Sequence, residues 1–289
     1  MRNIFQSICL AAGLFVASTL SANGQSRIER IEIQSENFEN LIGVSATREM
    51  MVYLPDGYDE SRADYAVLYG FHTFFEDETA LFENYNIATL LDAAISEGRL
   101  PPVIVITPDF STPMNHSLFA DSPVTGNFLT FALEDMVPAI DARYRTIRDR
   151  NARGLFGNHI GAYGAIKIAA RRPDLFGAVY GLHPVATTST PDGMVTFLNW
   201  EEYFEGVAKQ DLSAHWSYSL FTSFFQAFLP NPNNPPYFVD IPVTLQDGER
   251  IGDAALLNKL SESLPLIAEV ETYADNLKQL NGFKYDWGR

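Results

Sequence analysis

Two hydrophobic patterns alternate along most of the chain. The apolar runs at 66–69 and 103–106 have the length and β-branched content expected for strands buried on both faces of a sheet. Between and after these runs, at 89–98 and 127–144, apolar residues recur with helical spacing. Strands that alternate with helices predict an α/β fold, with a mostly parallel sheet flanked by helices.

The start of this pattern predicts a different strand arrangement. Alternating residues at 31–33 and 48–54, followed by a turn at 55–58, indicate an antiparallel hairpin at the entry to the sheet.

Beyond residue 185 the alternation gives way to an aromatic-rich stretch and a loop rich in proline and asparagine. We interpret 185–263 as a helical, proline-rich cap inserted into the domain, with a hairpin around Asp247 and Gly248. A simpler interpretation is that phenylalanines at helical spacing face the core. These phenylalanines are Phe221, Phe224, Phe225 and Phe228.

The composition narrows the class of protein and of partner. Of 289 residues, 46% are hydrophobic and 19% are charged, which suits a folded domain with a large core and argues against a disordered chain. The formal net charge of -16 would repel nucleic-acid phosphates and anionic lipids. We therefore expect no nucleic-acid partner.

The N-terminus has the pattern of a secretory signal. A single charge at Arg2 precedes an apolar run over 4–20, and Ala22-Asn23-Gly24 suits a cleavage site. We expect removal of 1–24, export to the periplasm or the medium, and a mature domain over 25–289 that has no membrane span. Cys9, the only cysteine, would leave with the signal, so we expect no disulfide. An anchoring helix is the alternative, but it needs about 20 apolar residues.

A strand and a helix meet at two glycines. Gly157 and Gly161 lie four apart around His159, and a small-residue segment follows over 162–171. This spacing predicts a nucleophile elbow, a sharp turn from strand to helix in which only small neighbours fit. His159 would then project above the carboxyl edge of the sheet.

Five further stretches lie before and after the elbow, at 52–58, 67–72, 122–127, 139–146 and 173–179. On these residues the chain resembles the putative-esterase family of α/β-hydrolases, the group of esterase D, feruloyl esterases and mycolyltransferase antigens. The resemblance covers most of 45–184. It implies an α/β-hydrolase fold and a carboxylic-ester hydrolase activity.

The site departs from the pattern of that family. The family has a serine where this chain has His159, so we do not expect hydrolysis by the usual acyl-serine route. The family usually follows its histidine with glycines, whereas here His72 precedes Thr73 and two phenylalanines. We expect Thr73, Phe74 and the backbone amide of Ile160 to line a narrowed oxyanion pocket.

The C-terminal pattern predicts a helix over 272–282, with Gly282 as its C-cap, and a core strand over 283–289. The resemblance implies that the acidic triad residue follows this strand and that the catalytic histidine follows one more strand. We therefore expect the last strand and helix of the fold, and the Ser-His-Asp triad, to be missing from the sequence. A truncated sequence is the alternative.

Three histidines fall at the ends of apolar strands: His72, His159 and His183. Together with Asp109, they are expected at the carboxyl edge of the sheet, where ligands bind. We expect His159, His183 and Asp109 to carry any catalysis. A zinc site formed by the three histidines, and a dead site filled by hydrogen-bonded side chains, are the alternatives. We expect His116 to lie in a solvated loop.

These residues leave two functions open. One is an exported carboxylic-ester or acyl hydrolase that needs no cofactor and works through His159. The other is an inactive relative that uses its pocket or cap to bind a small molecule, a glycan or a protein. The sequence does not decide whether the chain is an enzyme.

Overall fold

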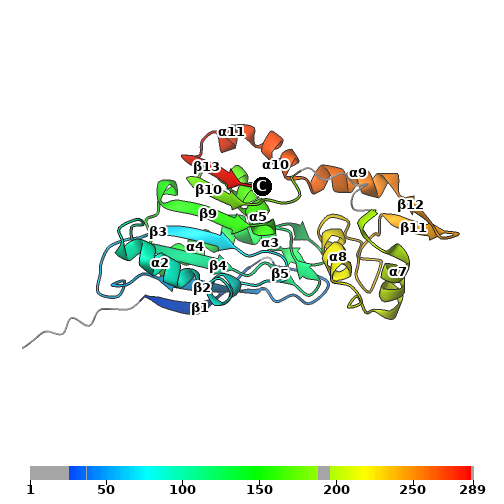
Figure 1. Ribbon diagram of the computed structural model, residues 1–289, viewed down its shortest axis with the longest axis horizontal. Coiled ribbons are helices and arrows are strands. Elements are labelled where there is room, and N and C mark those ends of the chain that lie inside the picture. The colour runs from blue at the N-terminus through cyan, green and yellow to red at the C-terminus, as the bar shows by residue number, and fades with distance from the viewer. Residues whose placement is uncertain (1–25, 37, 188–195, 288–289) are drawn as a thin grey trace, which may run out of the picture.

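The structure is a computed structural model that describes residues 26–36, 38–187 and 196–287. The expected signal segment and Cys9 therefore lie outside the described residues. A seven-stranded sheet forms the centre of the fold, in the order β1-β2-β4-β3-β9-β10-β13 (Figure 1). Its strands are β1 (Arg27–Gln34), β2 (Thr47–Leu54), β3 (Ala66–Phe71), β4 (Val103–Pro108), β9 (Arg153–Asn158), β10 (Ala178–Leu182) and β13 (Gly282–Asp286).

The pairing of these strands confirms the mostly parallel α/β sheet. β1 pairs with β2 in antiparallel register, as does β2 with β4, which confirms the entry hairpin. From β4 to β13 every neighbouring pair is parallel. All six residues of β4 are buried, because helices cover both faces of this part of the sheet.

Helices pack on opposite faces of the sheet. On one face α2 (Ile87–Ser96) buries Leu91 against Tyr53 and Val105. On the other face α4 (Met136–Arg143) and α5 (Ile160–Arg171) pack on the main core, to which Val52 and Ile106 belong. Neighbouring residues of one strand thus enter different cores, as the alternation of a strand requires.

The helix expected over 127–144 is interrupted. α3 (Phe128–Thr130) runs into a π-helical turn over Phe131–Asp135 before α4 begins. Pro138 lies inside α4 and has no N–H for a bond to the preceding turn. A wider turn just before the proline accommodates this missing donor.

The segment after β10 forms a group of elements beyond one end of the sheet (Figure 1). It contains α7 (Trp200–Lys209), α8 (Trp216–Phe228), β11 (Val243–Gln246), β12 (Glu249–Gly252) and α9 (Ala254–Ser263). β11 and β12 pair antiparallel around Asp247 and Gly248, which confirms the expected hairpin. Of the α8 phenylalanines, Phe225 and Phe228 are buried, whereas Phe221 and Phe224 are only partly buried. The description of 185–263 as a cap insertion stays a prediction.

Short elements complete the chain. They are α1 (Ala80–Glu83), β5 (Ser111–Thr112), β6 (Asn115–His116), β7 (Asp121–Ser122), β8 (Gly126–Asn127), a 3-10 turn at Arg150–Ala152, α10 (Leu266–Thr272) and α11 (Ala274–Leu277). The prediction of one helix over 272–282 was wrong. Gly282 opens β13 instead of capping a helix, because the Asn281 amide already donates to Gly177 and directs the chain into the sheet. Within the described residues, no helix is both long and apolar enough to cross a bilayer.

The joint between β9 and α5 is closely packed. A Cβ atom on Gly157 would lie 2.3 Å from the carbonyl carbon of Gly161. A Cβ atom on Gly161 would lie 2.1 Å from the carbonyl oxygen of Phe71, on the neighbouring strand. Backbone atoms cannot move aside as a side chain can, so both positions require glycine.

We expect Gly161→Ala to lower the free energy of unfolding by about 3 kcal/mol, because the added methyl group collides with backbone. Gly282→Ala is the matched control, since its nearest neighbour would be the Ala178 Cβ at an ordinary 3.6 Å. Urea unfolding followed by circular dichroism measures both variants. Equal stability of the two variants would contradict the close packing at this joint.

Candidate functional site

His159 occupies the sharp turn between β9 and α5. Its backbone has φ 58° and ψ −115°, a left-handed conformation that is rare for a residue with a side chain. The His159 amide donates to the carbonyl of Leu182 at 2.9 Å, which fixes the turn against β10. The imidazole is half-buried and lies just before the first turn of α5. This is the geometry that the spacing of Gly157 and Gly161 predicts.

His183 lies beside His159 at the end of the neighbouring strand. The two ring centroids are 6.3 Å apart, with an angle of 1° between the ring planes. His183 also has a positive φ, 51°, and its amide donates to the carbonyl of Asp286 at 2.7 Å. Trp287 stacks on its ring at 5.0 Å. Adjacent parallel strands therefore bring two of the expected catalytic residues together.

The environment favours the neutral form of the His159 imidazole. Burial lowers the pKa of His159, and the nearby His183 lowers it further. Among the described residues, no carboxylate accepts a hydrogen bond from this ring. A neutral imidazole has a lone pair on one nitrogen, so it can act as a nucleophile or as a base.

His72 is not available to a ligand. Its Nε2 accepts a hydrogen bond from the Phe110 amide at 2.9 Å, so Nδ1 carries the proton and donates to the carbonyl of Thr73 at 2.9 Å. The residue is 2% exposed, and this burial lowers its pKa. In the part of the chain that the structure describes, no three His, Cys, Asp or Glu side chains are placed to hold a metal ion. The alternative of a three-histidine zinc site is therefore not formed here.

Asp109 is placed away from the expected catalytic pair. Its Oδ1 accepts from the Ser111 amide at 2.8 Å, and its Oδ2 lies 3.8 Å from Arg48 Nη1. Its Oδ1 also lies 3.8 Å from Nε2 of His72, which is neutral because that nitrogen accepts a hydrogen bond. Asp109 thus belongs to a charge cluster that includes Arg48 and Glu78. A catalytic role for Asp109 beside the two histidines stays a prediction.

The expected oxyanion pocket is largely occupied. The Thr73 amide donates to Glu76 Oε2 at 3.2 Å, so a carboxylate holds one candidate donor. The Phe74 ring packs edge-on against His159 at 5.5 Å. The Ile160 amide lies in the first turn of α5, where backbone N–H groups have no partner within the helix. The Ile160 amide is therefore placed to act as a donor, whereas the Thr73 amide is already engaged.

The structure places His116 differently from the sequence analysis. We expected a solvated loop, but the residue is 0% exposed and packs against His72 at 5.0 Å and Phe74 at 5.8 Å. Its Nδ1 accepts from the Leu118 amide at 2.9 Å, and its Nε2 has no hydrogen-bond partner among the described residues. Burial holds the pKa of His116 well below its usual value. The burial of His116 could have been predicted only from the aromatic residues near it in the sequence.

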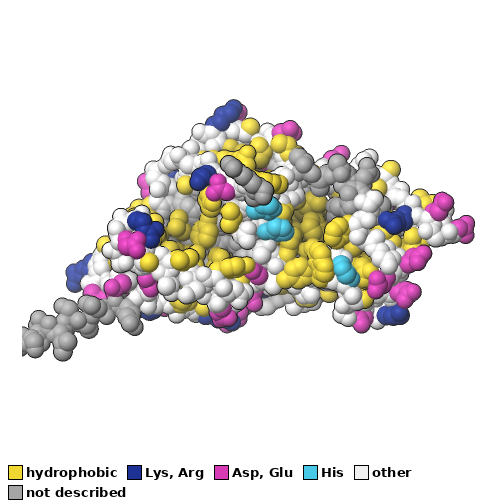
Figure 2. Space-filling view, in the orientation of Figure 1, with side chains coloured by type: hydrophobic (Ala, Val, Ile, Leu, Met, Phe, Trp, Pro, Cys, Tyr) yellow, Lys and Arg dark blue, Asp and Glu magenta, His cyan; other side chains and the backbone are white. Residues whose placement is uncertain are grey.

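Nine rings are linked by successive ring contacts that run out from the site and return to Phe75, the sequence neighbour of Phe74. We call them the aromatic row. Consecutive ring centroids are 5.0 to 6.3 Å apart. In order, its members are Trp287, His183, His159, Phe74, Phe224, Phe221, Phe197, Trp216 and Phe75. Phe75, Phe197 and Trp216 are each more than half exposed. Figure 2 shows apolar side chains gathered on this face between two groups of histidine atoms.

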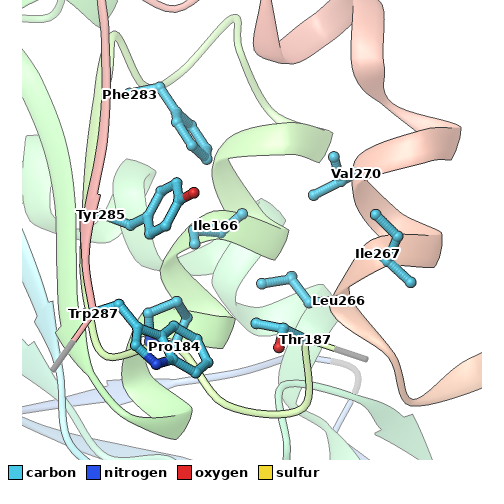
Figure 3. Close-up of a pocket in the computed structure, with 9 residues that line it drawn as sticks. All are labelled: Ile166, Pro184, Thr187, Leu266, Ile267, Val270, Phe283, Tyr285 and Trp287. Atoms are coloured by element: carbon cyan, nitrogen blue, oxygen red, sulfur yellow. The ribbon is translucent and has the colours of Figure 1, made fainter. Parts of the chain in front are cut away.

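An apolar groove of about 540 Å³ begins at one end of the aromatic row. Trp287 and Pro184 lie at that end, and Tyr285 and Phe283 continue along β13 (Figure 3). Side chains of α5 and α10 line the opposite side, among them Ile166 and Leu266. The pair of histidines therefore has an apolar surface on either side.

The comparisons with known proteins agree with this fold. Residues 44–243 match the family described as putative esterase, which is more than half of the chain. The chain therefore belongs to that family. A ferulic acid esterase shares the fold, with a TM-score of 0.57 and 19% identity over 90% of this chain and 78% of that structure. The expected α/β-hydrolase fold and esterase family are thereby confirmed.

Two curated relatives match part of the chain. Endo-1,4-beta-xylanase Y of Acetivibrio thermocellus is 31% identical over 109 residues, which are 37% of this chain and 9% of the xylanase. An esterase of Mycobacterium tuberculosis is 31% identical over 125 residues, which are 42% of this chain and 25% of that esterase. The chain thus spans a quarter or less of these relatives.

We expect the pKa of His159 to lie below 6.5 and to rise in His183→Asn, because this change removes the neighbouring imidazole that lowers it. Asparagine tolerates the positive φ at 183. Titration of the imidazole protons by NMR measures the change, with His215→Asn as a control outside the pair. An unchanged pKa in His183→Asn would show that the two rings do not interact.

The charge cluster around Asp109 predicts a pH dependence of stability. Burial, with the charges of Asp109 and Asp77, raises the pKa of Glu78 from 4.5 to about 7. A backbone hydrogen bond and the charge of Arg30 oppose this rise. The contribution of a carboxyl group with a raised pKa is fully present at pH values below its pKa in the unfolded chain. It is lost as the pH rises through its pKa in the folded protein, about 7.

We therefore expect the free energy of unfolding of the wild-type protein to fall by up to about 3 kcal/mol between pH 5 and pH 8. Glu78→Gln should not show this fall, because glutamine does not ionise. Urea unfolding at the two pH values measures the difference. Glu83→Gln, at an exposed position of α1, serves as the control and should keep the wild-type dependence. If Glu78→Gln keeps that dependence as well, another group is responsible.

Proposed function

We propose that the chain hydrolyses reactive carboxylic esters or related acyl compounds, with the His159 imidazole in place of the family's serine. The observation that carries this proposal is the backbone of His159. A side chain other than glycine is held at φ 58° on the elbow, with a neutral ring at the carboxyl edge of the sheet. Such local strain is retained where the surrounding structure requires it, most often at functional sites.

The proposed reaction has two steps. An unprotonated ring nitrogen of His159 attacks the ester carbonyl, a C–N bond forms, and the carbonyl oxygen becomes an oxyanion. The Ile160 amide, at the positive end of the α5 dipole, is the donor placed to stabilise that charge. The C–O bond to the leaving group breaks, and the leaving group takes up the proton that the other ring nitrogen loses, which gives a neutral acyl-imidazole. Water then attacks the acyl carbon, the C–N bond breaks, and a proton from water returns to the ring as the free acid is released.

This chemistry limits the substrates. Imidazole is a good leaving group itself, so the tetrahedral intermediate returns to reactants unless the ester has a leaving group that departs more readily. Esters of phenols, or thioesters, meet this requirement better than alkyl esters. The aromatic row and the groove beside Trp287 favour an apolar or aromatic acyl group.

The names of the relatives support the same class. A ferulic acid esterase shares the fold, and a relative from Xylanibacter ruminicola is an endo-1,4-beta-xylanase/feruloyl esterase, which is 29% identical over 135 residues. Ferulic acid is a planar aromatic acid. We further propose that residues 1–24 are a signal and that the mature chain acts outside the cytoplasm.

A second candidate function is binding without turnover. The Glu76 carboxylate holds the Thr73 amide, and the Phe74 ring packs on His159, so the pocket offers fewer donors to an oxyanion. A protein of this kind would bind an aromatic acid or ester along the aromatic row and release it unchanged.

The test is hydrolysis of p-nitrophenyl butyrate, with ethyl butyrate as the poor leaving group. We expect the wild-type protein to hydrolyse only the p-nitrophenyl ester, and His159→Ala to fall to the rate in buffer. The rate should increase with pH through the lowered pKa of His159 and then level off, because only the neutral ring attacks. His215→Asn is the matched control, since it also removes one imidazole but keeps a side chain that can cap α8.

Two outcomes would change the assignment. Equal rates for wild type and buffer, together with a rise in melting temperature on addition of ferulic acid, would favour binding without turnover. Labelling of the wild-type protein by a fluorophosphonate probe would show that a serine does the chemistry and would overturn the role of His159.

A further inference from the structure

Lys167 is a buried amine on the helix that follows the elbow. Its side chain is 4% exposed, although lysine is rarely buried without a close partner. The ammonium nitrogen lies 5.4 Å from the centre of the Tyr163 ring and 5.9 Å from that of Phe228. Its nearest carboxylate oxygen is Glu269 Oε1, at 3.8 Å.

That carboxylate is already committed to another cation. Arg171 donates from Nε to Glu269 Oε2 at 2.9 Å and from Nη2 to Oε1 at 2.8 Å. A bidentate pair of this kind uses both oxygens of the carboxylate. Lys167 therefore shares Glu269 with Arg171 and makes the longer of the two contacts, an ion pair at 3.8 Å. Burial, together with the charge of Arg171, lowers the pKa of Lys167 to about 8 against the opposing effect of Glu269.

Lys167 lines a polar cavity of about 350 Å³ between α5 and α10. The residues that line it carry hydroxyl groups (Ser263, Thr272 and Tyr273) and charges (Arg171, Glu262 and Glu269). None of the lining residues belongs to the aromatic row. The cavity is large enough for a molecule of a few carbon atoms, and its hydroxyl groups suit a ligand that carries hydroxyls.

We propose that this cavity binds small hydroxyaldehydes and that Lys167 captures them as an imine. The amine nitrogen attacks the aldehyde carbon, a C–N bond forms, and the carbonyl oxygen takes up a proton as the amine loses one. The carbinolamine then loses its oxygen as water. Amine and aldehyde thus give imine and water, with no change in oxidation state.

The surroundings favour an imine over other ligands of a lysine. A protonated imine keeps the positive charge that Glu269 faces, so the charge balance of the cavity is unchanged. A carbamate from carbon dioxide would place a second negative charge within about 4 Å of Glu269, which is unfavourable in a buried site. A free anion would compete with Glu269 for Arg171.

The test is reductive trapping with D-glyceraldehyde and sodium cyanoborohydride at pH 7, followed by peptide mass spectrometry. A lysine pKa of about 8 leaves about 300-fold more neutral amine at this pH than the ordinary pKa of 10.5 does. Allowing for the restricted access, we expect Lys167 to be labelled at least about tenfold faster than Lys209 and Lys278, which are 69% and 74% exposed. Labelling of Lys167 should level off above about pH 8.

Lys167→Arg keeps the positive charge beside Glu269. This variant should lose the fast labelling and keep the slow labelling of the other lysines. Labelling of Lys167 at the rate of Lys278, or more slowly, would overturn the proposal and leave Lys167 as a structural cation. Persistence of the fast labelling in Lys167→Arg would overturn it too. The wild-type comparison decides the matter even if this variant does not fold.

Discussion

The contact between three backbone segments, at Gly157, Gly161 and the carbonyl of Phe71, is the constraint on which the site depends. No Cβ atom can be accommodated at either glycine, so α5 begins directly against β3 and β9. This closeness turns the chain sharply at His159 and gives its backbone a left-handed conformation. The position of the imidazole is therefore a property of the backbone, and the chemistry of the side chain can vary without a change in the turn.

Around this fixed turn, neighbouring groups decide what the side chain can do. His183 lies at the end of the neighbouring strand and, together with burial, favours the neutral form of His159. The Phe74 ring packs on the His159 ring, and the Glu76 carboxylate accepts a hydrogen bond from the Thr73 amide. The fold of the esterase family is thus combined with close packing around the elbow residue. The aromatic row extends that site well beyond the elbow.

Much of this arrangement could be predicted from the sequence, because it depends on periodicity and on glycine. The order of the buried strands places His159 and His183 at adjacent strand ends, and the two glycines define the elbow. The partners of Asp109 and Thr73 could not be predicted, since they depend on where Arg48 and Glu76 point after the loops fold. The burial of His116 was missed for the same reason, because a polar stretch can still be covered by α8. Gly282 was misread because a glycine between helix and strand is consistent with either a cap or a strand start.

The pairing of β10 with β13 has a consequence for how the site is assembled. The Tyr180 hydroxyl donates a hydrogen bond to the Asp286 carboxylate across these strands, although the two residues are 106 positions apart in the sequence. Contacts between such distant segments form slowly, because a long loop must close before they gain any stability. The backbone of Asp286 accepts the hydrogen bond of the His183 amide, and Trp287 stacks on the His183 ring. The second histidine of the site therefore acquires its support only when the end of the described chain has joined the sheet.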